Sequence, residues 1–140
     1  MAIAFHFQTS RFSLPRNKIK DWLLLSAFME HKEVVDIQYV FCDDQYLLEL
    51  NNKFLHHNTY TDIVTFDDSS RNALRAEIYI SVDRVRENAR NFDTTFKNEL
   101  LRVMIHGVLH CMGYDDHSQK DKQKIQKKEN EYLKLFSEMK

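Results

Sequence analysis

Both glycines of the 140-residue chain, Gly107 and Gly113, fall within one stretch of seven residues. Glycine is the residue that readily takes a positive φ angle or lets another group come very close. The single proline, Pro15, lies far away near the N-terminus. The glycine stretch overlaps a segment with three histidines, between residues 106 and 117. This coincidence indicates that residues 106–117 have a task that the rest of the chain does not share.

The bulk composition predicts one soluble globular domain over residues 1–140, since 43% of the residues are hydrophobic and 29% are charged. No apolar run approaches the roughly 20 residues that span a bilayer. The N-terminus lacks a basic region followed by a long apolar core, so we expect no secretory signal. Two cysteines, Cys42 and Cys111, are too few for a disulfide framework, which favours a reduced cytoplasmic setting.

Hydrophobic periodicity predicts a mixture of strands and helices. Strands are expected at residues 2–8, 34–42, 62–66 and 76–81. Helices are expected from an N-cap at Ser13 to His31, after Asp43 or Asp44, at residues 83–92, after Thr94 or Thr95, and after Ser118. Because these elements lack a regular β-α-β rhythm, the expected fold class is α+β.

Two histidines, His106 and His110, are four residues apart in a segment that is expected to be helical. Residues at this spacing share one helix face, so their imidazoles can converge on one ion at about 2.0–2.1 Å. Gly113 stands at a natural helix stop, after which the chain turns back and Asp116 or His117 can supply a third ligand. Three protein ligands leave one position open, which is typical of a catalytic zinc site.

A lone His-x-x-x-His pair is common by chance, but the helix stop and the following Asp-Asp-His considerably strengthen the prediction of a metal site. Glycine inside a helix costs about 1 kcal/mol relative to alanine, so Gly107 predicts a close approach by substrate or by another backbone element. Gly107 also occupies the position where zinc peptidases of the His-Glu-x-x-His type keep their general base. A peptidase would therefore need a base from elsewhere.

The segment His106-Gly-Val-Leu-His110-Cys-Met-Gly113-Tyr-Asp resembles the His-Gly-x-Leu-His-Leu-x-Gly-Tyr-Asp-His signature of the YbeY family of bacterial rRNA maturation endoribonucleases. Segments 50–54, 61–66 and 77–81 fall in the family's order and rough spacing. The resemblance covers most of the chain and implies an α+β domain with a mostly four-stranded sheet packed with helices. It also implies metal-dependent cleavage of single-stranded RNA, in maturation of the 16S rRNA 3′ end and in ribosome quality control.

Two positions depart from the family pattern. The family's third histidine comes six residues after the second, where this chain has Asp116, followed by His117. Asp116 matches by register and His117 by residue type, with a slight preference for Asp116 as the third ligand. The family usually has an arginine after the aromatic residue of its Leu-Asn motif, and here that position is Leu55. This difference argues against arginine-assisted chemistry there.

The function expected is therefore a metal-dependent endoribonuclease that acts on single-stranded RNA, rRNA or a ribosomal subunit, with one zinc or another divalent ion and no membrane partner. Asp115, or whichever of Asp116 and His117 is not a ligand, could move protons; Asp115 and His117 are the catalytic candidates. Because the net charge is −1, RNA binding would need a local basic groove, to which Arg84, Arg86 and Arg90 could contribute.

The sequence leaves two alternatives open. One is another metallohydrolase, such as a peptidase. The other is a non-catalytic ribosome-binding module with a structural metal, an alternative that Leu55 keeps alive. The basic residues of segment 120–128 are expected to form a solvated helix face, and His56 with His57 either a substrate groove or an exposed loop. The sequence does not choose between water and the RNA 2′-hydroxyl as the nucleophile.

Overall fold

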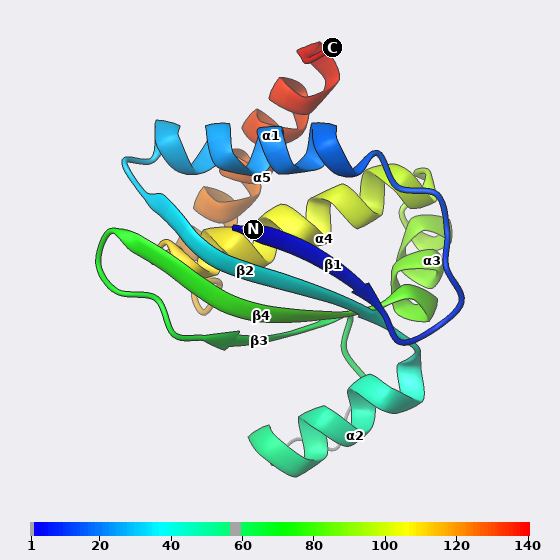
Figure 1. Ribbon diagram of the computed structural model, residues 1–140. Helices are drawn as coiled ribbons and strands as arrows, with labels where there is room; N and C mark the ends of the chain where they lie inside the picture. Colours follow the sequence, from blue (N-terminus) through cyan, green and yellow to red (C-terminus); the bar gives the residue numbers. More distant parts are fainter. Residues whose placement is uncertain (1, 57–59) are drawn as a thin grey trace.

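A four-stranded sheet lies at the centre of the computed structural model, which describes residues 2–56 and 60–140 (Figure 1). Its spatial order is β1-β2-β4-β3, and β1, β2 and β4 are parallel while β3 is antiparallel to β4. The strands are β1 (Ile3–Phe7), β2 (Glu33–Cys42), β3 (Ile63–Asp67) and β4 (Ala73–Ser81). The expected α+β class and the four-stranded sheet are both confirmed.

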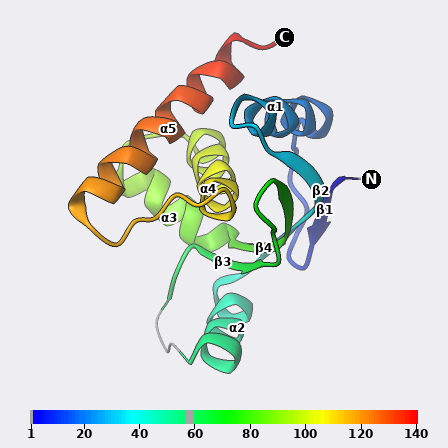
Figure 2. The same cartoon turned by 90° about the vertical axis from the view of Figure 1, so that its left-hand side faces the viewer.

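Five helices accompany the sheet in the described part of the chain. They are α1 (Arg16–Met29), α2 (Asp44–Leu55), α3 (Val82–Asn91), α4 (Phe96–Cys111) and α5 (Gln119–Glu138). Figures 1 and 2 show α1, α4 and α5 gathered on one side of the sheet and α2 on the other. None of the described helices is long and apolar enough to cross a membrane.

Helix α4 is the central element of the larger core, because apolar side chains cover it on nearly every side. Gly107 lies on its buried face, where a Cβ atom would come within 2.9 Å of Ile63 Cδ1 and 3.3 Å of Ile78. The expected close approach is therefore made by side chains of the sheet, and not by substrate or by another backbone. Glycine here lets α4 pack tightly on β3 and β4.

Local capping chemistry fixes most helix starts. Asp43, Ser81, Thr95 and Ser118 each accept a hydrogen bond from a backbone N–H in the first turn of the helix that follows. The expected cap at Ser13 is wrong. Helix α1 starts directly after Pro15, whose carbonyl accepts the Ile19 N–H at 3.0 Å, and no side chain caps it.

Strand β4 starts at Ala73, three residues before the expected start at residue 76. Its first residues pair with β2, where Ala73 lies opposite Glu33 and Leu74 opposite Val34. These backbone partners extend the strand through a region whose own side-chain pattern gives no strand signal. The two cysteines, Cys42 and Cys111, are both free and buried.

Candidate metal centre

Helix α4 ends in a glycine-dependent stop. Gly113 has a φ angle of 105°, and its N–H donates to the His110 carbonyl at 3.0 Å. The Tyr114 N–H donates to the Leu109 carbonyl at 3.1 Å, which completes a Schellman motif. The predicted helix stop is thus confirmed, and it turns the chain back so that the next residues pass beside the end of α4.

The loop after the stop is tied down by Tyr114. Its hydroxyl donates to Glu30 Oε1 at 2.7 Å, and Glu30 directly follows α1. The same carboxylate accepts hydrogen bonds from Lys128 Nζ at 3.0 Å and from the Tyr132 hydroxyl, both on α5. Three distant segments therefore meet at Glu30, and they define the position of the loop that carries Asp116.

Three potential ligand side chains converge beyond this stop. His106 Nε2 lies 2.9 Å from His110 Nε2, and Asp116 Oδ2 lies 3.6 Å from the first and 3.5 Å from the second. All three side chains are half-buried, so they remain open to solvent on one side. Two histidines come from one helix face and the carboxylate from the returning loop, as their spacing in the sequence indicates.

This triangle fits a metal ion. Zinc held at about 2.0–2.1 Å in tetrahedral geometry keeps its ligand atoms about 3.3 Å apart. The distances found here, 2.9, 3.5 and 3.6 Å, bracket that spacing. The donors are two imidazole nitrogens and one carboxylate oxygen, a set that suits zinc and other divalent first-row metals.

Glu129 on α5 orients the first histidine. Its Oε2 accepts a hydrogen bond from His106 Nδ1 at 2.5 Å, and its Oε1 binds Arg102 at 2.9 Å. A proton held on Nδ1 leaves the Nε2 lone pair free to face the other two ligands. The Glu129 side chain is only 5% exposed, so this orientation is fixed inside the protein.

Glu129 was not among the residues predicted from the sequence, although its position in the helix pattern of α5 indicates that it is buried. Glu129 occupies the same buried face of α5 as Ile125, Tyr132 and Phe136. A carboxylate on an apolar helix face requires a partner, since a buried unpaired charge is costly. The partner, His106, is 23 positions away in the sequence, so local pattern does not reveal it.

The acids around His106 act on its pKa. Burial opposes the imidazolium, but the hydrogen bond and charge of Glu129, with Asp116 and Asp62 nearby, outweigh it, so the pKa of His106 is raised. Burial acts the other way on Asp62 and raises its pKa, although the neighbouring His106 partly offsets this. The site thus concentrates negative charge around two imidazoles.

A small cavity of about 110 Å³ adjoins His106 and contains two further acids that sequence reasoning missed. Asp62 precedes β3, and Glu99 lies two turns before His106 on α4. Arg102 and Glu129 also line the cavity. Glu99 could have been found from its spacing, because residues 99, 102, 106 and 110 are three or four apart and share one face of the helix.

The two catalytic candidates of the loop are not among the three converging side chains. Asp115 is exposed and lines a separate cavity of about 270 Å³ with Tyr114 and Lys124. His117 is also exposed, and the three-ligand group in the described residues contains Asp116 instead. The geometry thus favours Asp116 over His117 as the third ligand, while the roles of Asp115 and His117 stay predictions.

The arginines of α3 make local contacts. Arg84 forms an ion pair with Asp44 at 2.6 Å, and Arg90 one with Glu87 at 2.6 Å. The Arg86 guanidinium lies over the Phe96 ring, 4.9 Å from its centroid. Leu55 ends α2 with 41% of its surface exposed. His56 caps that helix with a φ angle of 58°, and His57 lies outside the described residues.

Comparison with known proteins supplies the family. The family model described as Endoribonuclease YbeY matches residues 5–137. The chain belongs to the YbeY family. An Endoribonuclease YbeY of Flavobacterium psychrophilum is 44% identical over 134 residues, which cover 96% of each chain. An Endoribonuclease YbeY of Porphyromonas gingivalis is 40% identical over 136 residues, covering 95% of this chain and 90% of its relative.

The YbeY fold also has a solved counterpart. The solution structure of a Thermotoga maritima protein matches with a TM-score of 0.69 and 29% identity, over 96% of this chain and 88% of that one. The resemblance inferred from the histidine motif is therefore confirmed along nearly the whole chain. In this YbeY-family chain, the side chains that converge with the two motif histidines include Asp116.

Proposed function

We propose that this YbeY protein is a metal-dependent endoribonuclease that cleaves single-stranded RNA. The observation that carries the proposal is the triangle of His106, His110 and Asp116, whose ligand atoms are spaced as one tetrahedral ion requires. Family membership supports RNA as the substrate, because the relatives are named endoribonucleases. We extend the proposal to maturation of the 16S rRNA 3′ end and to ribosome quality control, with rRNA or a ribosomal subunit as partner.

In this proposal His106, His110 and Asp116 hold the ion, and zinc is the metal proposed. When bound, a divalent ion supplies Lewis-acid chemistry, which polarises a phosphoryl oxygen and acidifies water. Glu129 keeps the His106 ring in the tautomer whose Nε2 faces the site. The half-buried ligand side chains leave one side of the site open to a substrate phosphate.

Proton transfer is assigned in this proposal to Asp115 and His117. Both are exposed side chains that flank Asp116 in the sequence, so they can meet a strand that approaches the loop from solvent. The nucleophile is either water or the RNA 2′-hydroxyl. The products decide between them, because a 2′,3′-cyclic phosphate forms only when the 2′-oxygen attacks phosphorus.

A peptidase is disfavoured by the surroundings of Gly107. That position is buried against Ile63 and Ile78, with no room for a glutamate side chain aimed at substrate.

The two buried free cysteines also suit the proposed reduced cytoplasmic setting.

The test is cleavage of a single-stranded RNA that carries the 16S 3′ end, by purified protein of measured metal content. Cleavage should stop when the metal is chelated and return when zinc or another divalent ion is restored. The His110→Ala variant should be inactive, while His6→Ala, which changes an exposed histidine on β1, should match the wild type. A fully metal-loaded protein that hydrolyses peptides and leaves RNA intact would overturn the proposal.

A further inference from the structure

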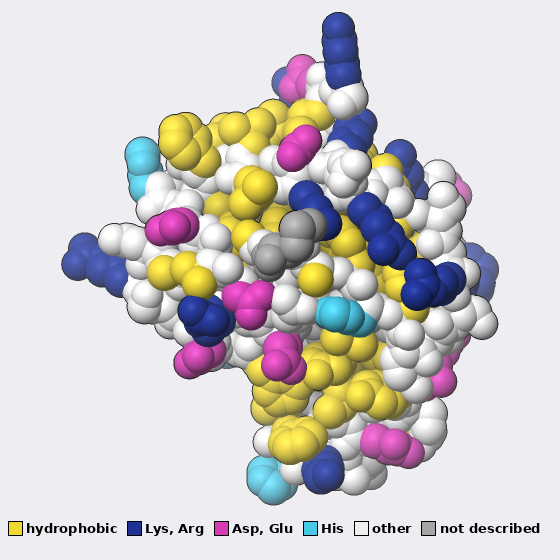
Figure 3. Space-filling view, in the orientation of Figure 1, with side chains coloured by type: hydrophobic (Ala, Val, Ile, Leu, Met, Phe, Trp, Pro, Cys, Tyr) yellow, Lys and Arg dark blue, Asp and Glu magenta, His cyan; other side chains and the backbone are white. Residues whose placement is uncertain are grey.

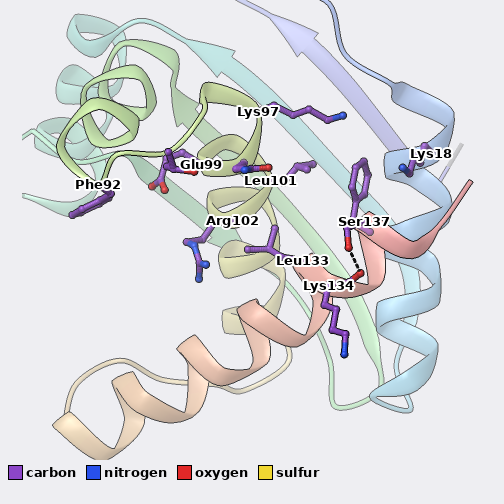
Figure 4. Close-up of a pocket in the computed structure, with 12 residues that line it drawn as sticks. Lys18, Phe92, Lys97, Glu99, Leu101, Arg102, Leu133, Lys134 and Ser137 are labelled. Carbon is purple, nitrogen blue, oxygen red and sulfur yellow. Dashed lines mark hydrogen bonds between the residues drawn. The ribbon is translucent and has the colours of Figure 1, made fainter.

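A cavity of about 730 Å³ opens where the first turns of α1 and α4 meet the last turns of α5. Figure 4 shows its lining side chains coming from all three helices, with Phe92 from the end of α3 on one rim. Its volume lies within the roughly 300–1,000 Å³ of typical ligand pockets. The cavity is distinct from the metal triangle, since none of the three ligands lines it.

Three lysines from three different helices line this cavity: Lys18, Lys97 and Lys134, referred to below as the lysine cradle. None of them forms an ion pair with any residue that the structure describes. Lys18 Nζ lies 4.2 Å and Lys97 Nζ 5.5 Å from the centroid of the Phe136 ring, so two cations converge on one aromatic side chain. Two ammonium groups over one ring, with no ion-pair partner among the described residues, favour a bound anion, and Lys134 adds a third positive charge to the lining.

The cavity shares two lining residues with the smaller cavity beside His106. Glu99 and Arg102 line both the 730 Å³ cavity and the 110 Å³ cavity that adjoins His106. Arg102 donates to Glu129, which in turn binds His106, so a single run of contacts joins the two places. A flexible strand whose phosphate reaches the metal triangle can therefore continue along α4 into the lysine cradle.

The remaining lining suits a nucleic acid strand better than a small anion. Phe92 is 68% exposed on the rim, so its ring can stack on a base. Leu101 and Leu133 add apolar surface. The Glu99 carboxylate is buried, and burial raises its pKa, which weakens the one acidic side chain that lines the cavity.

We infer that this cavity binds the backbone of a single-stranded RNA on one side of the cleaved phosphate. The lysine cradle contacts phosphates, and Phe92 stacks on a base. The inference rests on the proposed function for its substrate class, and it names a binding surface outside the metal centre. It also supplies the local basic groove that a chain of net charge −1 needs for RNA.

The first experiment measures binding of a single-stranded oligoribonucleotide in EDTA, so that no cleavage occurs, at several salt concentrations. A triple variant, Lys18→Gln, Lys97→Gln and Lys134→Gln, removes the cradle charges. Each lost phosphate contact lowers the log–log salt slope by about 0.7, so the slope should fall by about 2. Affinity should drop on the order of 10- to 100-fold at 0.1 M salt.

The matched control removes the same charge elsewhere, by Lys20→Gln, Lys32→Gln and Lys53→Gln. Lys20 lies over Phe5, Lys32 donates to the Arg71 carbonyl, and Lys53 lies over Phe54, all away from the cavity. This control should keep most of the salt slope, and thermal melting should show both variants folded. Equal losses in the two triple variants, or no loss in the cradle variant, would overturn the inference.

A second variant separates stacking from charge. Phe92→Ala should weaken RNA binding by about fivefold or more while leaving the salt slope unchanged, because stacking releases no counterions. Phe28→Ala is the matched control, since Phe28 is 75% exposed on α1 and does not line the cavity. Equal affinities of Phe92→Ala and the wild type would show that Phe92 does not stack on a base.

Cleavage assays keep the two proposals apart. The cradle variant should raise KM for a long RNA and leave kcat near the wild-type value, because the metal triangle is intact. If the wild type binds RNA through the cradle but never cleaves it, the endoribonuclease proposal is wrong and the inferred RNA-binding site is still supported. Cleavage with an unchanged KM in the cradle variant would refute the cradle and leave the endoribonuclease standing.

Discussion

The two faces of the sheet differ in the side chains that are packed against them. On one face, α4 and α5 bury Glu99 and Glu129 and hold His106 among hydrogen-bonded partners. On the other face, α2 rests on a small apolar cluster around Leu47 and ends with Leu55 exposed. Figure 3 shows hydrophobic side chains over the lower part of the view, where Figure 1 places α2.

This contrast bears on the departure from the family pattern. The family's arginine would project from the end of α2, where this chain has Leu55. The buried hydrogen bonds that join Arg102, Glu129 and His106 lie on the α4–α5 side. Buried, paired polar groups hold catalytic geometry better than exposed ones, so we expect activity to depend on the α4–α5 face.

The largest effect is expected from loss of a ligand. His106→Ala or Asp116→Ala should reduce metal affinity more than about 100-fold, since even partners of ligands are worth 10- to 100-fold. RNA cleavage should fall to background with it. Metal content by elemental analysis and cleavage by gel measure both effects. Asp116→Ala compared with His117→Ala also decides the third ligand, and equal, negligible losses would remove both from the site.

The next effect tests the buried network directly. Glu129→Gln should lower metal affinity about 10- to 100-fold, because the amide orients His106 less strongly than a carboxylate does. Glu131→Gln is the control, as it removes an exposed carboxylate from the same helix. Competition with a metal chelator gives both affinities. Identical affinities in the two variants would mean that Glu129 does not support the site.

A third prediction tests the packing of α4 on the sheet at Gly107. Gly107→Val should lower the free energy of unfolding by about 2–3 kcal/mol, because its side chain overlaps Ile63 and Ile78. Gly107→Ala should cost less, about 1 kcal/mol or under, since the Ile63 terminal methyl can rotate away and alanine favours the helix. Urea denaturation measures both. A valine variant as stable as the wild type would show that the helix is not held tightly on the sheet.

The pH dependence of stability tests the Glu30 junction. Burial would raise the pKa of Glu30, but the hydrogen bonds from Tyr132 and Tyr114 and the Lys128 ammonium lower it. A carboxyl with a depressed pKa stabilises the fold above its unfolded pKa of about 4.3, and that contribution is lost as the pH falls through the folded pKa. At pH 7, Glu30→Gln should therefore destabilise by about 1–2 kcal/mol.

Below about pH 4.3 the difference between Glu30→Gln and the wild type should shrink. Glu138→Gln, which changes an exposed acid at the end of α5, should track the wild type at every pH. Urea midpoints across pH 3–7 measure this. A constant difference between Glu30→Gln and the wild type over that range would contradict the assigned ionisation.

The smallest effect is expected from restoring the family's arginine. Leu55→Arg should change stability by within about 0.5 kcal/mol, as exposed substitutions usually do. Cleavage should change by about twofold or less, because the proposed metal ligands lie on α4 and in the loop that follows it. Steady-state kinetics on the 16S-type RNA measures it. A tenfold or greater gain would show that the α2 face takes part in catalysis.

Much of the fold could be predicted because its signals are local. Asp43, Thr95 and Ser118 mark helix starts by hydrogen bonds that span three residues, and Gly113 marks a stop through its own φ angle. The pair His106 and His110 is likewise readable, since a helix repeats its face every three to four residues.

The rest of the site depended on contacts that no local rule contains. Glu129 reaches His106 only because α5 crosses α4, and Asp62 joins them only because β3 lies under α4. The lysine cradle gathers residues from α1, α4 and α5, so its charges look scattered in the sequence. The wrong cap at Ser13 has a local cause. The helix starts directly after Pro15, so Ser13 lies too far from its first turn to cap it.

The Glu30 junction also bears on how the chain folds. Tyr114 and Tyr132 reach Glu30 across 84 and 102 positions of sequence. Contacts between such distant positions close large loops, which costs conformational entropy and slows folding. The loop that carries Asp116 is therefore held by contacts of high sequence separation, whereas Gly113 stops α4 through local hydrogen bonds.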